Sequence, residues 1–139
     1  MKKIIFSSLV ITIAIISQSF YQGINASIQN GKNVYATYCI SCHMENGNGL
    51  ENAFPSLVKT GNLGDKNKLV KIVTKGMRGP IVVKSAKFDA EMAGFDLSDK
   101  EVADVLNYIR NSWGNKAPLI QSSEIAAAKK ADVKGYQAY

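Results

Sequence analysis

Residues 39–43 read Cys39-Ile40-Ser41-Cys42-His43, and this stretch decides how the rest of the chain is interpreted. Two thiols three positions apart lie on one side of a helical turn, and an imidazole follows directly after the second thiol. The chain of 139 residues contains two cysteines and one histidine in total, so this pentapeptide holds all of them. The pentapeptide is therefore the candidate functional site.

The C-x-x-C-H spacing predicts covalent attachment of haem. Cys39 and Cys42 can add to the two vinyl groups on neighbouring edges of the porphyrin, and His43 then lies under the iron as an axial ligand. Three other interpretations compete: a thioredoxin-like dithiol, a zinc site and a simple disulfide. A thioredoxin-like dithiol needs a βαβ surround, which the sequence does not indicate. Structural zinc needs four nitrogen or sulfur ligands, and the two cysteines and one histidine supply only three.

The first 26 residues have the layout of a secretory signal peptide. Met1-Lys2-Lys3 is positively charged, residues 4–16 are almost wholly apolar, and a polar stretch ends at Ala26, after which cleavage is expected. The apolar run is short for a membrane span, which needs about 20 residues. We therefore expect a periplasmic or other extracytoplasmic location, whereas an uncleaved N-terminus would anchor the chain to a membrane. An export signal followed closely by C-x-x-C-H also favours haem over a disulfide.

The charge pattern argues against nucleic acid as a partner. The net charge is +6 at pH 7, but the sequence has no long basic run and no basic stripe interleaved with aromatic residues. Lysines are frequent between Lys59 and Lys87. They form either an ordinary solvated face or a surface that steers an acidic redox partner.

The hydrophobic periodicity predicts an all-α domain over residues 27–116. Its first helix is expected at 27–43, where Tyr38 and Cys42 lie four positions apart on one face and the helix runs into the cysteines. Residues 44–64 are rich in glycine and asparagine, and this composition predicts a loop.

Two further helices have clear boundary signals. One is expected at 66–75, where Asp65 is the N-cap. The other runs from Asp99 to about residue 112, with Ser98 and Glu101 forming a capping box at its start. Its apolar stripe consists of Val102, Val105, Leu106 and Ile109.

The remaining segments predict little regular structure. The run Ile81–Val83 is too short to predict a strand. Residues 117–139 are expected to form a C-terminal tail with a weak helix at about 123–131, which docks only loosely on the domain. The tail is either an interaction segment or a plain surface helix.

The composition points to methionine sulfur as the sixth iron ligand, because His43 has no second histidine to pair with it. Met1 leaves with the signal peptide, and Met44 is adjacent to His43 and cannot reach the opposite haem face. Met77 and Met92 remain. We favour Met92, because the capped helix that follows it would anchor its loop; Met77 is the alternative.

These features together resemble a class I monohaem cytochrome c over about residues 31–115. In that family a glycine-rich turn follows C-x-x-C-H, and here Gly47 and Gly49 fill it. A proline then accepts the N–H of the haem histidine, and Pro55 looks like that residue. The resemblance implies that the Pro55 carbonyl orients His43 and raises its donor strength.

The second half of the chain extends the resemblance. Gly79-Pro80-Ile81 resembles the stretch before the distal methionine. Residues 102–115 look like the terminal helix of cytochrome domains fused to copper nitrite reductases and of small haem subunits of dehydrogenases. In the family the N- and C-terminal helices cross around one covalently bound haem, and the resemblance implies a close approach at Gly31 with Tyr35 packing nearby.

The resemblance and the ligand pair imply an electron carrier rather than an enzyme, since a haem with protein ligands on both faces has no open site for a substrate. The expected partners are redox proteins that donate and accept single electrons. The family usually has Met-Pro at the distal ligand, and Met92-Ala93 leaves the loop freer. If Met92 is displaced, the alternative is a small-ligand-binding or sensing haem protein. A haem subunit of a larger oxidoreductase is a further alternative.

Overall fold

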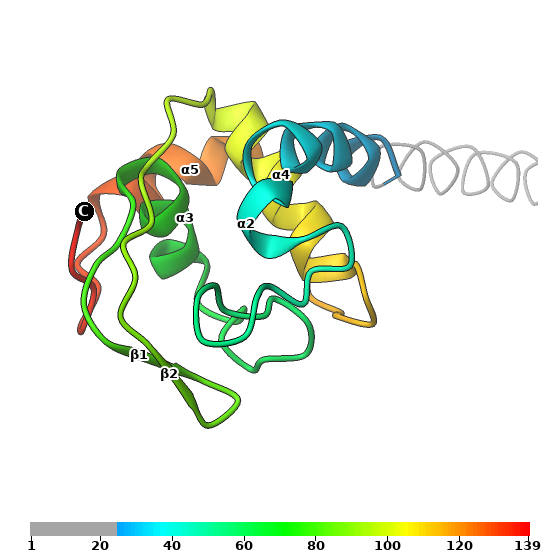
Figure 1. Cartoon of the computed structure of the whole chain (residues 1–139). Coiled ribbons are helices and arrows are strands. Elements are labelled where there is room, and N and C mark those ends of the chain that lie inside the picture. The colour runs from blue at the N-terminus through cyan, green and yellow to red at the C-terminus, as the bar shows by residue number, and fades with distance from the viewer. Residues whose placement is uncertain (1–24) are drawn as a thin grey trace, which may run out of the picture.

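The computed structural model describes residues 25–139, and most of its regular structure is helical (Figure 1). The signal peptide expected at 1–26 lies outside the described residues except for its last two positions. Among residues 25–139, none of the helices combines the length and the apolar content that crossing a membrane requires. The helices are an N-terminal helix over residues 25–38, α2 (Ile40–His43), α3 (Lys66–Lys75), α4 (Asp99–Asn111) and α5 (Ser122–Lys130).

The boundaries of α3 and α4 follow the signals in the sequence. Asp65 accepts a hydrogen bond from the backbone N–H of Lys68 at 3.1 Å, which satisfies one of the free donors at the start of α3. Ser98 and Glu101 form a reciprocal capping box at the start of α4. The helix predictions at 66–75 and from residue 99 onward are therefore confirmed.

A short antiparallel hairpin departs from the all-α prediction. β1 (Ile81–Val83) pairs with β2 (Ala86–Phe88), with Ile81 opposite Phe88. Lys84 and Ser85 connect the strands with φ values of +49° and +67°. Such two-residue turns normally use asparagine, aspartate or glycine, which adopt positive φ at little cost. The usual turn signal is thus missing, and the sequence does not predict the hairpin for this reason.

The hydrophobic core lies where α3, α4 and α5 meet. The predicted stripe of α4 is buried there, as is Val70 of α3. Ile125 of α5 is 0% exposed, and burial of a side chain of this size stabilises the fold by about 2 kcal/mol. Ion pairs join Lys66 to Glu124 and, at 2.6 Å, Lys129 to Asp99. The expectation that the helix within 117–139 docks only loosely is therefore wrong.

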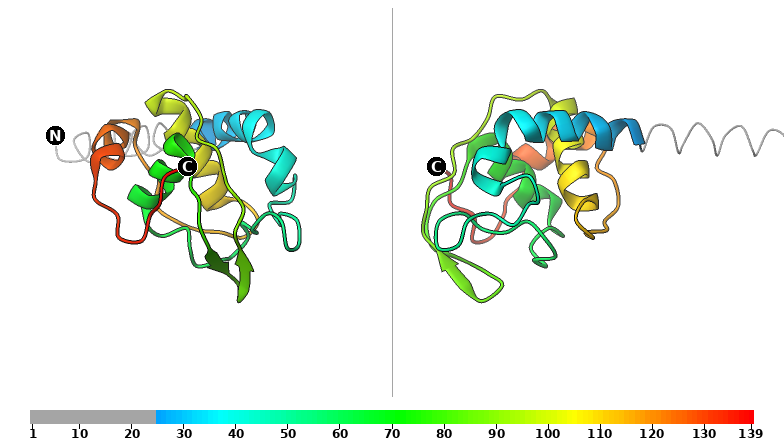
Figure 2. Two further views of the ribbon diagram at one scale, coloured as in Figure 1. Left: turned by 60° about the vertical axis from the view of Figure 1, so that its left-hand side comes forward. Right: turned by 45° about the vertical axis from the view of Figure 1, so that its right-hand side comes forward.

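The N-terminal helix packs against α4 at Gly31. A Cβ atom on Gly31 would lie 1.9 Å from the backbone oxygen of Asp104, so only glycine permits this approach. One turn later, the ring of Tyr35 is buried. Its centroid lies 5.3 Å from the ring centroid of Tyr108 and 5.3 Å from that of Trp113. Both views of Figure 2 show the N-terminal helix lying beside α4.

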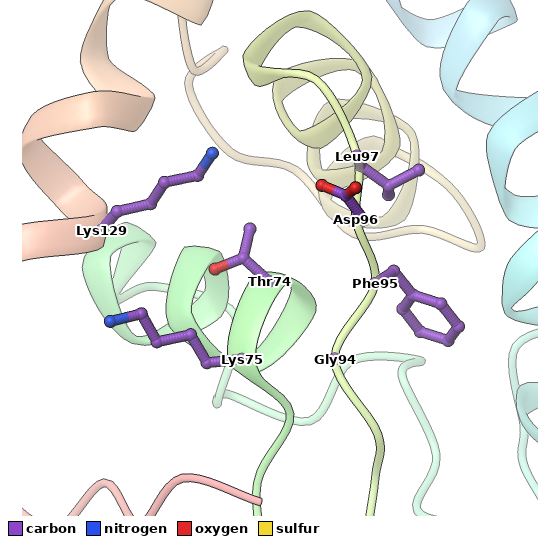
Figure 3. Close-up of a pocket in the computed structure, with 7 residues that line it drawn as sticks. All are labelled: Thr74, Lys75, Gly94, Phe95, Asp96, Leu97 and Lys129. Atoms are coloured by element: carbon purple, nitrogen blue, oxygen red, sulfur yellow. The ribbon is translucent and has the colours of Figure 1, made fainter.

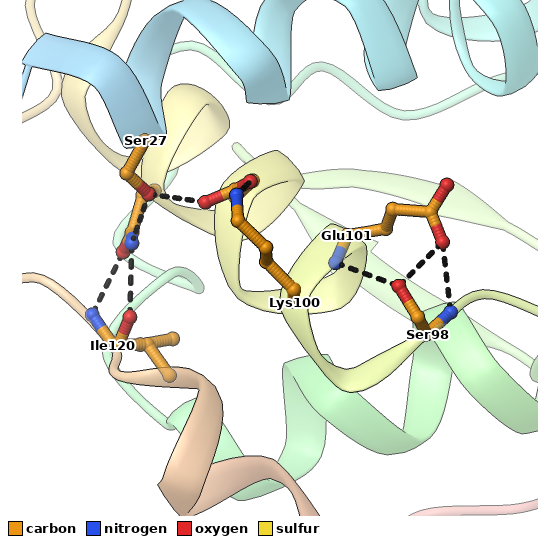
Figure 4. A network of polar contacts seen from close by, with 7 residues as sticks. Ser27, Ser98, Lys100, Glu101 and Ile120 are labelled. Atoms are coloured by element: carbon orange, nitrogen blue, oxygen red, sulfur yellow. Dashed lines mark hydrogen bonds and ion pairs between the residues drawn. The ribbon is translucent and has the colours of Figure 1, made fainter.

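The buried amide of Asn107 ties three segments together (Figure 4). Its Nδ2 donates to Ser27 Oγ at 3.0 Å and to the carbonyl oxygen of Ile120 at 2.9 Å, while its Oδ1 accepts the backbone N–H of Ile120 at 2.7 Å. Ser27 Oγ donates in turn to Asp104 Oδ1 at 2.6 Å. One side chain of α4 therefore fixes the N-terminal helix and the segment that enters α5.

Candidate functional site

The thiols and the imidazole of the pentapeptide lie at the end of the N-terminal helix. The helix breaks at Cys39, and α2 then carries Cys42 and His43. The backbone N–H of His43 donates to the carbonyl oxygen of Cys39 at 2.9 Å, so the two residues are one helical turn apart. Both cysteines are free thiols. The local fold thus gathers two sulfurs and one imidazole on a single turn.

His43 is oriented by the backbone of Pro55. The imidazole is 8% exposed, and its Nδ1 lies 3.0 Å from the carbonyl oxygen of Pro55. A carbonyl can only accept, so Nδ1 carries the proton and Nε2 keeps a lone pair for a metal. Burial lowers the pKa of His43, although the hydrogen bond to Pro55 opposes the shift. The neutral imidazole, which is the form that binds iron, is therefore favoured.

Gly49 allows the loop to bring Pro55 under His43. Its backbone N–H donates to the carbonyl oxygen of His43 at 3.0 Å, and its φ is +67°. A Cβ atom there would lie 2.2 Å from the backbone oxygen of Phe54. Glycine is therefore required both for the left-handed backbone and for the close approach of the returning chain.

Two side chains also hold this loop, through contacts that the sequence does not predict. The hydroxyl of Tyr35 donates to the carbonyl oxygen of Met44 at 2.7 Å, and burial raises the pKa of Tyr35 well above its usual range. Asn115 accepts the backbone N–H of Lys59 at 2.8 Å and donates to the carbonyl oxygen of Leu57 at 2.9 Å. A pattern in a local window cannot reveal the Asn115 contacts, because their partners lie far apart in the chain.

The chemistry of the thiols disfavours the competing interpretations. Burial, with a smaller contribution from Cys42, raises the pKa of Cys39 to about 11. A thioredoxin-like dithiol instead needs a thiol with a lowered pKa. Within residues 25–139, no group of three or more histidine, cysteine, aspartate or glutamate side chains is placed to hold a metal ion. Cys39 is thus not an activated thiol, and residues 25–139 offer no zinc cage.

The two candidate methionines lie opposite each other. The backbone N–H of Met77 donates to the carbonyl oxygen of Met92 at 2.8 Å, and the N–H of Met92 donates to the carbonyl oxygen of Met77 at 2.9 Å. Directly opposed residues of an antiparallel pair project their side chains to the same side. The fold therefore brings both thioethers together, and Met77 stays an alternative to Met92.

A separate pocket of about 360 Å³ lies between α3, α5 and residues 94–97 (Figure 3). Lys75, Lys129 and Asp96 line it, while the ring of Phe95 points away from the lysines and packs against Tyr38 at a centroid distance of 5.6 Å. Its lining has no thiol, imidazole or thioether, so it is not the candidate site.

Comparisons with known proteins agree with this geometry. A sequence model of the family described as Cytochrome c matches residues 28–113. The chain is 36% identical over 92 residues to a cytochrome c-552 of Thermus thermophilus. This match covers 62% of this chain and 70% of the relative.

Larger proteins also match. The chain is 39% identical over 102 residues to the cytochrome c subunit of the alcohol dehydrogenase (quinone) of Gluconobacter oxydans, covering 68% of this chain and 21% of that subunit. It is 35% identical over 108 residues to the gluconate 2-dehydrogenase cytochrome c subunit of Pantoea cypripedii. This match covers 73% of this chain and 24% of that subunit. The chain thus spans less than a quarter of either subunit.

Proposed function

The chain belongs to the cytochrome c family, and on that premise we propose that it is an exported single-electron carrier with one covalently bound haem c. Bound haem supplies an iron that exchanges one electron reversibly between its ferric and ferrous states. One electron enters from a donor protein and one leaves to an acceptor, and no atoms are transferred. The residues of the chain must therefore attach the haem, ligate its iron and admit redox partners to its edge.

Cys39 and Cys42 are the proposed points of attachment. Each S–H would add across one vinyl double bond of the porphyrin: the sulfur would bond to one carbon, the hydrogen atom would go to the other, and nothing would leave. The placement of both free thiols on one turn, directly before a buried imidazole, supports this assignment.

His43 is the proposed proximal ligand, and Met92 is the proposed distal ligand. The hydrogen bond from Nδ1 of His43 to the carbonyl of Pro55 leaves Nε2 free and raises the donor strength of the ring. This hydrogen bond, next to the two thiols, is the observation that carries the proposal. Met92 would supply a thioether sulfur, with Met77 as the alternative, and no position would remain for a substrate.

The class I arrangement is proposed for residues 27–116, with the N-terminal helix and α4 crossing beside the haem. The contact between Gly31 and Asp104 supports this arrangement, because it brings the two helices within touching distance. In this chain the residues that follow α4 also contribute to the core, through Ile120 and Ile125.

The partners are proposed to be redox proteins in the periplasm or another extracytoplasmic compartment. The signal-like layout of residues 1–26 supports export. Two relatives are named as cytochrome c subunits of dehydrogenases, which supports a dehydrogenase as the electron donor. Removal of Lys2 and Lys3 with the signal peptide would leave 15 basic and 11 acidic side chains, and the resulting net charge of +4 favours partners with an acidic docking face.

Expression together with a haem-attachment system tests the proposal. The wild-type protein should carry one haem per chain that survives denaturation, with the pyridine haemochrome spectrum of two thioether bonds. The double variant Cys39→Ser, Cys42→Ser should lose all covalent haem. The control Ser41→Ala, between the two thiols, should keep it. A secreted wild-type chain that is colourless, with its thiols free or bridged to each other, would contradict the proposal.

A further inference from the structure

The residues after α5 fold back over the end of α3, and we define residues 132–139 as the C-terminal strap. The hydroxyl oxygen of Tyr136 lies 2.7 Å from the carbonyl oxygen of Gly76 and 3.2 Å from that of Lys71. A hydroxyl has one proton, and the shorter contact assigns it to Gly76, where α3 ends. The ring is also held, because Lys71 Nζ lies 5.7 Å from its centroid.

The backbone around Met77 is bonded on both sides. On one side, Met77 exchanges two hydrogen bonds with Met92. On the other side, the backbone N–H of Arg78 donates to the carbonyl oxygen of Gln137 at 3.1 Å, and the carbonyl before Met77 accepts from Tyr136. Successive backbone groups of an extended chain point to opposite sides. The Met77 segment therefore lies between Met92 and the strap, as Figure 1 shows for the red C-terminal residues beside the green chain that leaves α3.

The Met92 segment, the Met77 segment and the strap pack so closely that Gly76 has no space for a side chain. Its φ is +68°, and a Cβ atom there would lie 2.2 Å from the backbone oxygen of Met92 and 2.7 Å from the Cβ of Tyr139. The strap thus closes the outer side of the segment that supports Met92. It also follows the residues, 28–113, that the family model matches.

We propose that Tyr136 is a positioning residue through which the C-terminal strap holds the methionine pair and restrains release of the distal sulfur from haem iron. The inference rests on the proposed function, and it holds whichever of the two methionines binds. The sulfur would leave the iron when its loop opens. Each hydrogen bond that must break for the loop to open lowers the fraction of molecules in the open state, which we call the open population. Loss of one hydrogen bond of typical net strength raises that population about fivefold.

Carbon monoxide uptake by the reduced full-length holoprotein measures the open population, because carbon monoxide binds ferrous iron after the sulfur has left. Tyr136→Phe removes the hydroxyl and keeps the ring. We expect uptake about fivefold faster than in the wild type. Tyr139→Phe makes the same chemical change on a ring that is 63% exposed, and it should keep the wild-type rate.

A second control separates positioning from a general loss of stability. Ile125→Val loosens the core and should lower the melting temperature without changing carbon monoxide uptake. Wild-type uptake in Tyr136→Phe would overturn the proposal, and so would equal acceleration in Ile125→Val. A wild-type ferric protein without the near-infrared thioether band would overturn the proposed ligand pair, and the role of the strap with it. The spectrum of the wild type therefore tells the two failures apart.

Discussion

His43 donates its Nδ1 proton to a backbone carbonyl, so the orientation of its imidazole depends on loop shape rather than on a second functional side chain. The acceptor belongs to Pro55, whose ring fixes φ, and Gly49 makes room for the returning chain. Substitution of Pro55 keeps the carbonyl but loosens the backbone that presents it. At the residue scale, the backbone of Pro55 therefore fixes the proposed proximal side, while the proposed distal side offers two sulfurs.

Met92→Leu should abolish the near-infrared charge-transfer band of the ferric protein and lower its midpoint potential from a positive value. Leucine has a similar volume but no sulfur to bind iron, and thioether ligation raises the potential. Absorption spectroscopy and redox titration measure the two effects. Met77→Leu is the matched control and should keep both properties. If the results of the two variants are exchanged, Met77 is the distal ligand.

α4 is the element that organises the domain, because α3, α5 and the N-terminal helix all pack against it. Its apolar stripe is buried toward α3 and α5, its backbone at Asp104 receives Gly31 of the N-terminal helix, and Asn107 binds segments on either side. Arg110 is buried as well, and it donates to the carbonyl oxygen of Leu63 at 3.0 Å. The N-terminal helix, α3 and α5 are therefore placed relative to this one helix.

Gly31→Ala should destabilise the protein by about 3 kcal/mol, because the added methyl group meets backbone that cannot move as a side chain can. Urea unfolding measures the change. Gly64→Ala is the matched control: a Cβ atom there meets nothing within 4 Å, so stability should be unchanged or slightly higher. Similar losses in both variants would contradict the close helix contact.

Ser98→Ala should destabilise the protein by about 1 kcal/mol, because the backbone N–H of Glu101 loses its acceptor at the start of α4. Urea unfolding at neutral pH checks the value, with Ser123→Ala at an exposed position of α5 as the control. Equal effects of the two substitutions would show that the capping box does not stabilise α4.

The same cap predicts a pH dependence. Hydrogen bonds from Ser98 hold the pKa of Glu101 below its ordinary value of 4.5 in the folded protein. A lowered folded-state pKa contributes stability that is present above the unfolded-state pKa and is lost as the pH falls through the folded-state pKa. The stability difference between wild type and Ser98→Ala should therefore shrink on acidification below 4.5. A difference that stays constant in acid-titrated unfolding curves would contradict this coupling.

At the scale of the whole molecule, single buried polar groups join segments that are far apart in the chain. Asn107 binds Ser27, 80 positions before it, and Ile120, 13 positions after it. Tyr136 reaches Gly76 across 60 positions. The apolar core brings these segments together, and the polar contacts fix how they are aligned.

Asn107→Ala should destabilise the protein by about 3 kcal/mol, because the buried N–H and carbonyl of Ile120 lose their partner. Thermal unfolding of the holoprotein measures the loss. Asn33→Ala, at an exposed position of the N-terminal helix, is the control and should be neutral or slightly stabilising. If Asn107→Ala leaves the stability unchanged, the prediction is wrong, and water replaces the amide as the partner of Ile120.

The features that the sequence predicts are those encoded in short windows. The pentapeptide at 39–43 and the caps at Asp65 and Ser98 each place their partners within a few positions. The periodicity of α4 likewise predicts the residues that the structure buries. Local geometry sets these features, so no knowledge of the rest of the fold is needed.

The features that the sequence does not predict depend on distant partners or on unusual residues. Tyr38 shares a predicted face with Cys42 but is 41% exposed, because the contact with α4 runs through Gly31 and Tyr35. α5 has few large apolar residues to reveal its packing against the core. The hairpin lacks the usual turn residues, and neither Asn115 nor the strap follows any periodic pattern.

The strap comes after the pentapeptide 39–43 in the chain, so its residues are translated later. A nascent chain delivered from its N-terminus presents Cys39, Cys42 and His43 before Tyr136 exists to reach Gly76. During that interval the Met77 segment can bond to Met92 but not to the strap, so the methionine pair is held on one side only. Vectorial synthesis would therefore let a maturation enzyme reach the thiols before the strap secures the methionine pair.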